Sequence, residues 1–117
     1  MSQIVRIRVH QTQMKDKDLL IQAIQDAGYV CEQPKFVLFG FRAQIRIRGR
    51  QIGFNKAGDF YEMVSRGEGS VTQILQDITQ RYICRLARQR LEAQGFAVAS
   101  EETQKDGRIH LVLRRMA

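Results

Sequence analysis

The chain has 117 residues, 44% of them hydrophobic, which predicts one globular domain over residues 1–117. No apolar run approaches the roughly 20 residues of a membrane helix, and arginines interrupt the apolar N-terminal stretch, unlike a signal peptide. The net charge is +7, and 14 of the 19 basic residues are arginine, a side chain that binds phosphate and carboxylate bidentately. We interpret Cys31 and Cys84, far apart in sequence, as reduced thiols in a cytoplasmic compartment.

The first half of the chain is predicted to form a strand, a helix and further strands. Residues 4–10 alternate between apolar and polar, which predicts a half-buried strand. Asp16 or Asp18 can cap a helix that Gly28 ends, and residues 29–32 form a short strand before the turn at Pro34. Residues 36–48 are then expected to form one long strand. Its core side should carry Val37, Phe39, Phe41, Ala43, Ile45 and Ile47.

The second half begins with a hairpin. Residues 52–55 and 60–64 are expected to pair around a turn at residues 56–59. Ser70 is placed as the N-cap of a long helix that reaches Gln94 and is ended by Gly95. Residues 96–100 and 108–115 form a last hairpin that turns through residues 105–107.

The predicted order is therefore β-α-β-β-β-β-α-β-β. The sequence around Gly28 and Tyr29 resembles the sequence around Gly95 and Phe96, because each reads as helix, glycine, aromatic residue and strand. This echo fits either a βαββ pseudo-repeat or the ordinary use of glycine at a helix end. Both interpretations predict a two-layer α+β fold, with one antiparallel sheet of about six or seven strands and two helices on one face.

An arginine-rich sheet face is the strongest functional signal. The expected non-core positions of the first, long central and last strands carry Arg6, Arg8, His10, Arg42, Arg46, Arg48, Arg108, His110 and Arg114. No acidic residue lies within those three strands. Like charges opposite one another destabilise a sheet, so an anionic ligand that binds this face would reduce the repulsion between its arginines. The alternative is a face that uses arginine for solubility and edge protection.

The sequence thus predicts a non-enzymatic binding module that docks an anionic partner through Arg6, Arg8, Arg42, Arg46, Arg48, Arg108 and Arg114. One candidate partner is a nucleic-acid backbone, although few aromatic residues are available for stacking on bases. The other is an acidic protein surface, for which the chain would be a small accessory subunit. An exposed edge strand could also pair two copies, and the sequence leaves the oligomeric state open.

Other patterns carry weaker signals. Arg81, Arg85 and Arg88 share one face of the long helix, where Asp77 and Glu92 at four-residue spacing favour a salt-bridged surface over a second anion contact. The two histidines are too few for a structural zinc site, and no cofactor or small-molecule substrate is indicated. No nucleophile–base pair or carboxylate pair in a cleft is indicated, so we expect no enzyme.

The C-terminal 65 residues or so resemble a known family of uncharacterised proteins, the hypothetical chloroplast reading frame thirty-five proteins of cyanobacteria and red-algal plastids. The shared positions are Gly53, Phe54, Gly58, residues 61–64, residues 79–82, residues 94–96, Val98, Asp106, Gly107, Ile109, Leu111, Val112 and Arg115. Tyr61, Glu62 and Tyr82 are among them, and we interpret them as packing residues. The resemblance implies a bacterial cytoplasmic or plastid stromal protein and no known reaction.

Overall fold

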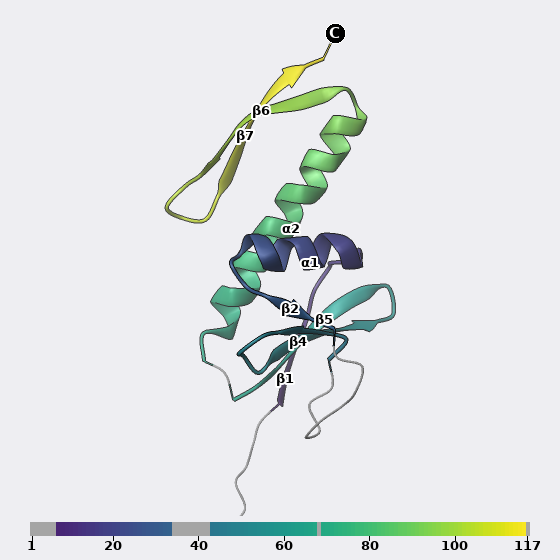
Figure 1. Ribbon diagram of the computed structural model, residues 1–117, viewed down its shortest axis with the longest axis vertical. Coiled ribbons are helices and arrows are strands. Elements are labelled where there is room, and N and C mark those ends of the chain that lie inside the picture. Colours follow the sequence, from purple (N-terminus) through teal and green to yellow (C-terminus); the bar gives the residue numbers. More distant parts are fainter. Residues whose placement is uncertain (1–6, 34–42, 68, 117) are drawn as a thin grey trace, which may run out of the picture.

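The computed structural model describes residues 7–33, 43–67 and 69–116. The elements follow the predicted order, and Figure 1 shows them. They are β1 (Ile7–Gln11), α1 (Lys17–Asp26), β2 (Cys31–Glu32), β3 (Ile45–Ile47), β4 (Ile52–Ala57), β5 (Phe60–Arg66), α2 (Val71–Ala93), β6 (Phe96–Thr103) and β7 (Ile109–Arg115). The α+β class is confirmed.

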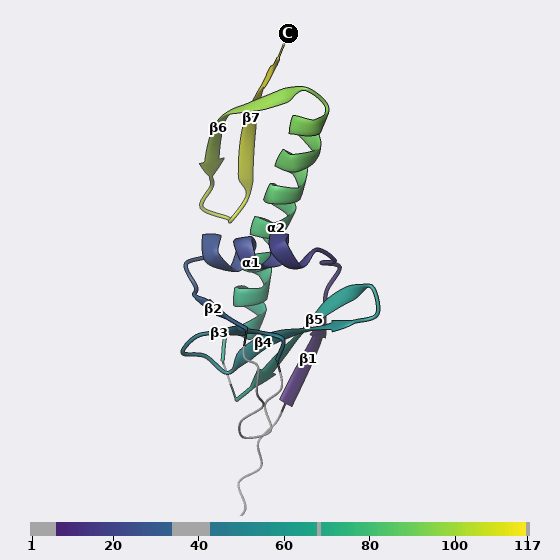
Figure 2. The same ribbon diagram turned by 45° about the vertical axis from the view of Figure 1, so that its right-hand side comes forward.

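The strands divide into two sheets rather than the one that the sequence predicts. Five strands form an antiparallel sheet in the order β1-β5-β4-β3-β2, and β6 pairs with β7 in a second, two-stranded sheet. Figures 1 and 2 show the β6–β7 hairpin at the far end of α2, with α1 between it and the five-stranded sheet. The long central strand is shorter than expected, because β3 covers only Ile45–Ile47. Residues 36–42 of the expected strand lie outside the described residues.

One hydrophobic core joins both helices to one face of the five-stranded sheet. Helix α1 contributes Leu20, Ala23 and Ile24, whose spacing places them on one side of the helix. The first half of α2 contributes Val71, Ile74, Ile78 and Tyr82, and the strands contribute Ile45, Ile47, Ile52, Phe54 and Met63. Neither helix is long and apolar enough to cross a membrane.

The two helix ends explain the echo in the sequence. Gly28 and Gly95 follow the C-caps of α1 and α2, and each has a φ of +92°. Only glycine adopts this left-handed conformation without steric cost, so both chain segments leave their helix in the same way. At the other ends, Asp16 caps α1 through the backbone N–H of Leu19 at 3.0 Å. Ser70 occupies the N-cap position of α2, but its side chain makes no capping hydrogen bond.

Candidate anion-binding face

The open face of the five-stranded sheet, which we define as the face away from α1 and α2, can be read from the strand register. Arg46 pairs with Gly53, Gly53 with Val64, and Val64 with Val9. Residues paired across strands share a face, and residues two apart along a strand do so too. The buried Ile45, Phe54 and Met63 occupy the neighbouring row and face the helices, so the row of Arg46 faces away from them.

Two of the predicted arginines lie on the same side of the sheet, on this open face. Arg46 on β3 and Arg48, which follows the strand, point to the same side. The Arg48 Nε donates to Glu32 Oε1 of β2 at 2.8 Å, and its side chain is still 66% exposed. Arg66 at the end of β5 joins them, because it pairs with Ile7 and alternates with the buried Ser65. Sequence reasoning missed Arg66 because the expected strand ended at residue 64, whereas β5 continues to Arg66.

The side chains of β1 point to the opposite faces of the sheet from those predicted. Arg8 pairs with the buried Ser65 and His10 with the buried Met63, so both lie on the helix side of the sheet edge. Ile7 and Val9, expected in the core, are instead 58% and 54% exposed on the open face. The open face therefore carries an apolar strip on β1 and the arginines of β3 and β5, while Val64 between β1 and β3 is buried at 8% exposure in a small cluster with Ala43.

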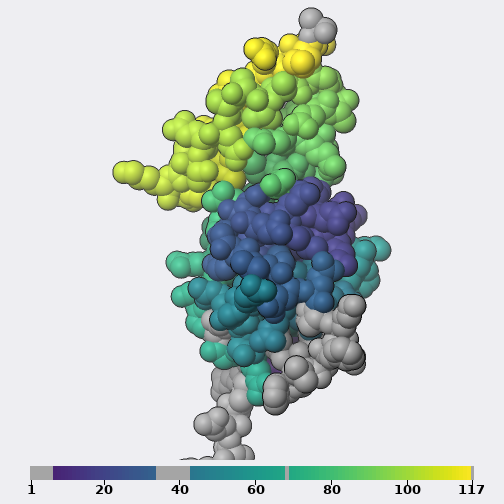
Figure 3. Space-filling model, in the orientation of Figure 1, coloured from purple at the N-terminus to yellow at the C-terminus, as the bar shows by residue number. Residues whose placement is uncertain are grey.

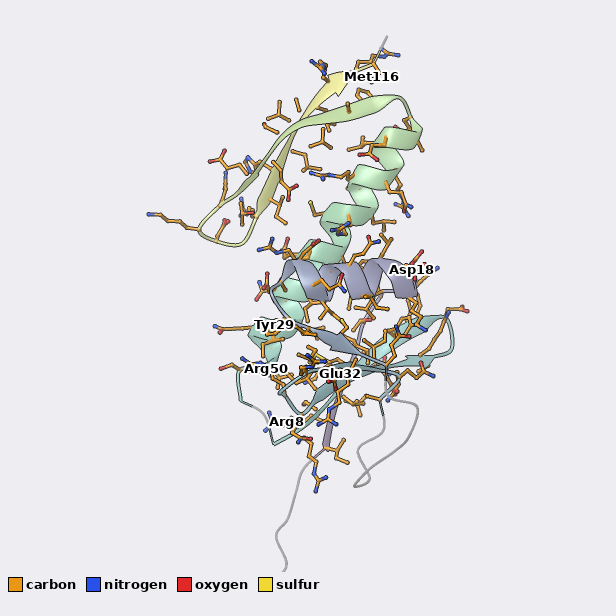
Figure 4. All side chains as sticks on the ribbon, in the orientation of Figure 1. Arg8, Asp18, Tyr29, Glu32, Arg50 and Met116 are labelled. Carbon is orange, nitrogen blue, oxygen red and sulfur yellow. The ribbon has the colours of Figure 1, made fainter. Side chains whose placement is uncertain are left out.

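The predicted arginines of the last strand do not join this face. Arg108 and Arg114 belong to the β6–β7 hairpin, which is a separate sheet, and His110 lies there with Arg114. The expectation that the first, central and last strands present one continuous arginine surface is therefore wrong. Arg6 and Arg42 lie outside the described residues. Figure 4 shows Arg8 near the five-stranded sheet and Met116, beyond β7, at the opposite end of the molecule.

A second arginine group forms an ion-pair network beside a cleft of about 210 Å³ between α1, α2 and the hairpin. Arg85 Nε and Nη2 donate to the two carboxylate oxygens of Asp26 at 2.5 and 2.8 Å. Arg88 pairs with Glu101 of β6, rather than with Glu92 as the spacing predicts. The expected Arg81–Asp77 pair is present at 3.3 Å. Each guanidinium already holds a carboxylate, which favours a structural role over anion capture.

The ionisable groups of this network have shifted pKa values. The hydrogen bond from Arg85 lowers the pKa of Asp26, since it stabilises the carboxylate. Burial raises the pKa of the Cys84 thiol, and the nearby Glu101 charge raises it further. Burial also raises the pKa of Cys31. Both cysteines are free, and thiols shifted in this direction stay protonated and unreactive.

The positions shared with the resembled family have packing roles. Tyr61 and Tyr82 are buried, at 4% and 5% exposure. The Tyr82 hydroxyl accepts hydrogen bonds from the backbone N–H groups of Lys15 at 3.1 Å and Asp16 at 3.0 Å, and so fixes the start of α1 on α2. Glu62 is half-buried and lies on the open face, opposite Gln11 of β1. Over the described ranges, no three histidine, cysteine or carboxylate side chains gather as metal ligands do.

Comparison with known proteins adds one finding. A family model described as "Protein of unknown function (DUF1257)" matches residues 22–112, which is more than three quarters of the chain. No curated protein and no solved structure matches.

Proposed function

We propose that this chain, which belongs to the DUF1257 family, is a non-enzymatic accessory subunit that docks an acidic protein surface on its open sheet face. One observation carries the proposal: Ile7 and Val9 are exposed on the face that also presents Arg46, Arg48 and Arg66. Apolar side chains bordered by arginine fit a protein partner with an apolar centre and carboxylates around it.

Protein is favoured over nucleic acid by the chemistry of this face. A single-stranded nucleic acid binds to aromatic side chains on which its bases stack, beside a basic groove. The row of the open face that runs from β3 to β1 holds Arg46, Gly53, Val64 and Val9, and the one exposed aromatic side chain among the described strand residues of this face is Phe60 at the start of β5, which is too little for a stacking surface. Arg48 already binds the carboxylate of Glu32, and charge-assisted pairs of this kind are the contacts that an acidic protein surface makes with arginine.

The compartment is part of the proposal. The matched residues overlap the stretch that resembles the hypothetical chloroplast reading frame thirty-five proteins, which supports membership of that cyanobacterial and plastid group. We infer a cytoplasmic or stromal location from that resemblance, and the two free thiols agree with a reducing compartment.

Fluorescence anisotropy with two labelled probes tests the proposal. One probe is a peptide that alternates leucine with glutamate and aspartate, and the other is a 20-nucleotide single strand. We expect the peptide to bind, and Val9→Lys or the pair Arg46→Glu and Arg48→Glu to weaken it at least tenfold. The matched control is Arg108→Glu with Arg114→Glu, which makes the same charge change on the hairpin and should leave binding within twofold.

The two probes separate the partner classes. Peptide binding should persist from about 50 to 200 mM salt, because an apolar contact contributes to it. Binding of the oligonucleotide alone, with a loss of orders of magnitude over that salt range, would show phosphate contacts instead and reject the protein partner. Equal weakening by the hairpin control would reject the open face as the docking surface. Circular dichroism on each variant confirms that it is folded.

A further inference from the structure

Strand β1 forms one edge of the five-stranded sheet, with β5 on its inner side and no strand of the described residues on its outer side. The opposite edge, β2, has two residues, whereas β1 has five and pairs with β5 without a register shift. Native proteins often protect an edge with a bulge, a proline or a lysine, and β1 has none of the three. Figure 3 shows the β6–β7 hairpin projecting at the end of the molecule away from this sheet, so the hairpin does not cover the edge.

The backbone of β1 turns alternate residues toward β5 and toward the free edge. The backbone N–H of Arg66 in β5 donates to the carbonyl of Gln51 at 2.9 Å, so Arg66 faces β4 and the preceding Ser65 faces β1. Ser65 is paired with Arg8, which therefore bonds to β5. The residues that alternate with Arg8 direct their N–H and C=O groups outward, and these are Ile7, Val9 and Gln11.

The side chains of β1 determine what an added strand must carry. Ile7 and Val9 are exposed on the open face, whereas Val64, farther from the edge, is buried with Ala43. An apolar contact on this face is therefore available at the edge. Arg8 is exposed on the other side of β1. A strand paired with β1 would place its own side chains alternately against the two apolar residues and against Arg8.

Arg8 also lacks the carboxylate that many arginines of this chain hold. The described arginines with a carboxylate partner include Arg48, Arg81, Arg85, Arg88 and Arg108. Within the described ranges Arg8 has none, and residues 1–15 of the sequence include no acidic side chain. The edge is therefore complementary to an extended segment that alternates apolar and acidic residues.

We infer that β1 holds such a segment of the partner protein as an additional antiparallel strand, with apolar residues opposite Ile7 and Val9 and a carboxylate opposite Arg8. The inference rests on the proposed function and states how the partner's chain is held. Neighbouring strands of the five-stranded sheet pair antiparallel, which is also slightly the more stable arrangement. In such a complex, backbone hydrogen bonds supply the affinity and the alternate side chains supply the specificity.

A second copy of the chain fits this edge less well. Antiparallel pairing of β1 with its own copy, centred on Val9, would place Arg8 of each chain opposite His10 of the other. Both guanidinium groups would then still lack a carboxylate. Each chain also has a net charge of +7, so the two copies repel each other, whereas an acidic segment is attracted.

Methylation of the probe's backbone tests this inference. The probe is the labelled peptide that alternates leucine with glutamate and aspartate, made in two N-methylated forms. In the antiparallel strand, residues opposite Ile7 and Val9 donate their N–H groups to β1, whereas a residue opposite Arg8 directs its N–H away. We expect N-methylation of the leucines to weaken binding at least tenfold, and N-methylation of the acidic residues to leave it within twofold.

Val9→Pro makes the matching change in the full chain. It removes the outward N–H and keeps an apolar side chain, and an edge strand tolerates proline where its N–H faces solvent. We expect it to weaken binding of the unmethylated peptide at least tenfold. Val9→Ile is the matched control, because it keeps both the N–H and the apolar side chain, and it should bind within twofold of the wild type. Circular dichroism shows whether each variant is folded, and the methylated peptides decide the question even if Val9→Pro is not.

The outcomes separate this inference from the proposed function. A peptide that responds equally to both methylations, or only to methylation of its acidic residues, is not held as the strand described. If Arg46→Glu with Arg48→Glu still weakens that peptide, the proposed function stands and the edge strand is rejected. An unmethylated peptide that does not bind overturns both. A chain that sediments as a dimer at the assay concentration, and that Val9→Pro makes monomeric, would place a second copy on this edge instead.

Discussion

Asp26 at the end of α1 and Arg85 of α2 form a two-point ion pair, with N–O distances of 2.5 and 2.8 Å. Arg85 also donates to Gln22 at 3.0 Å, one turn earlier on α1. Paired donors in the fixed fork of a guanidinium define a direction as well as a distance, so this contact fixes one point of the helix crossing beside the packed core. It lies next to the point where α2 extends beyond the core.

Asp26→Asn should lower the free energy of unfolding by about 1 kcal/mol at pH 7, the upper range for partly exposed ion pairs. The hydrogen bond from Arg85 lowers the pKa of Asp26 below its ordinary value of 3.8. The stabilisation is therefore complete above that value and is lost as the pH falls through the pKa of the folded state. Urea unfolding at pH 7 and pH 2.5 should show a difference from wild type that is smaller at the acidic pH.

The charge-matched control for that variant is Asp59→Asn, in the exposed turn between β4 and β5. It removes the same charge without touching a helix. A difference at pH 7 as large as that of Asp26→Asn would mean that net charge, and not the ion pair with Arg85, accounts for the effect.

Tyr82→Phe should destabilise the fold by about 1–3 kcal/mol, because it removes the acceptor for two backbone N–H groups at the start of α1. The ring of Tyr82 is buried, so no water replaces the hydroxyl without rearrangement. Tyr29→Phe is the control, since Tyr29 contacts Arg50 through its ring, which phenylalanine keeps. Thermal unfolding of the two variants measures the difference, and equal midpoints would show that the Tyr82 hydroxyl contributes nothing.

Gly28→Ala should cost about 1–2 kcal/mol, the penalty for a side chain in the left-handed conformation. No atom lies within 4 Å of the added methyl group, so the cost comes from the φ of +92° alone. Gly69→Ala also meets open space but has an ordinary φ, and it should change stability by less than about 0.5 kcal/mol. Chemical denaturation compares them, and a Gly28→Ala variant as stable as Gly69→Ala would contradict this account of the helix end.

Local patterns in the sequence determined most of the secondary structure, including both helices, their glycine ends and the turns at Gly58 and Gly107. Alternation in β1 correctly separated Ile7 and Val9 from Arg8 and His10. It could not tell which side meets the helices, because an edge strand buries little of either face.

The candidate site was harder to predict, because it depends on which strands share a sheet. Arg46 and Arg114 follow the same local pattern, yet one belongs to the five-stranded sheet and the other to the separate hairpin. The length of α2 decides this: its 23 residues carry the chain past α1 before β6 begins. Hydrophobic periodicity gives the length of the helix, but not the point where the core beside it ends.

Amide hydrogen exchange should divide the chain at about residue 83. Protection should be strong in α1, β4, β5 and the first half of α2, whose apolar residues are buried, and weak in residues 83–116, none of which is buried. Protection of β7 as strong as that of β4 and β5 would contradict this division of the chain, because it would show that the β6–β7 hairpin is as stable as the five-stranded sheet.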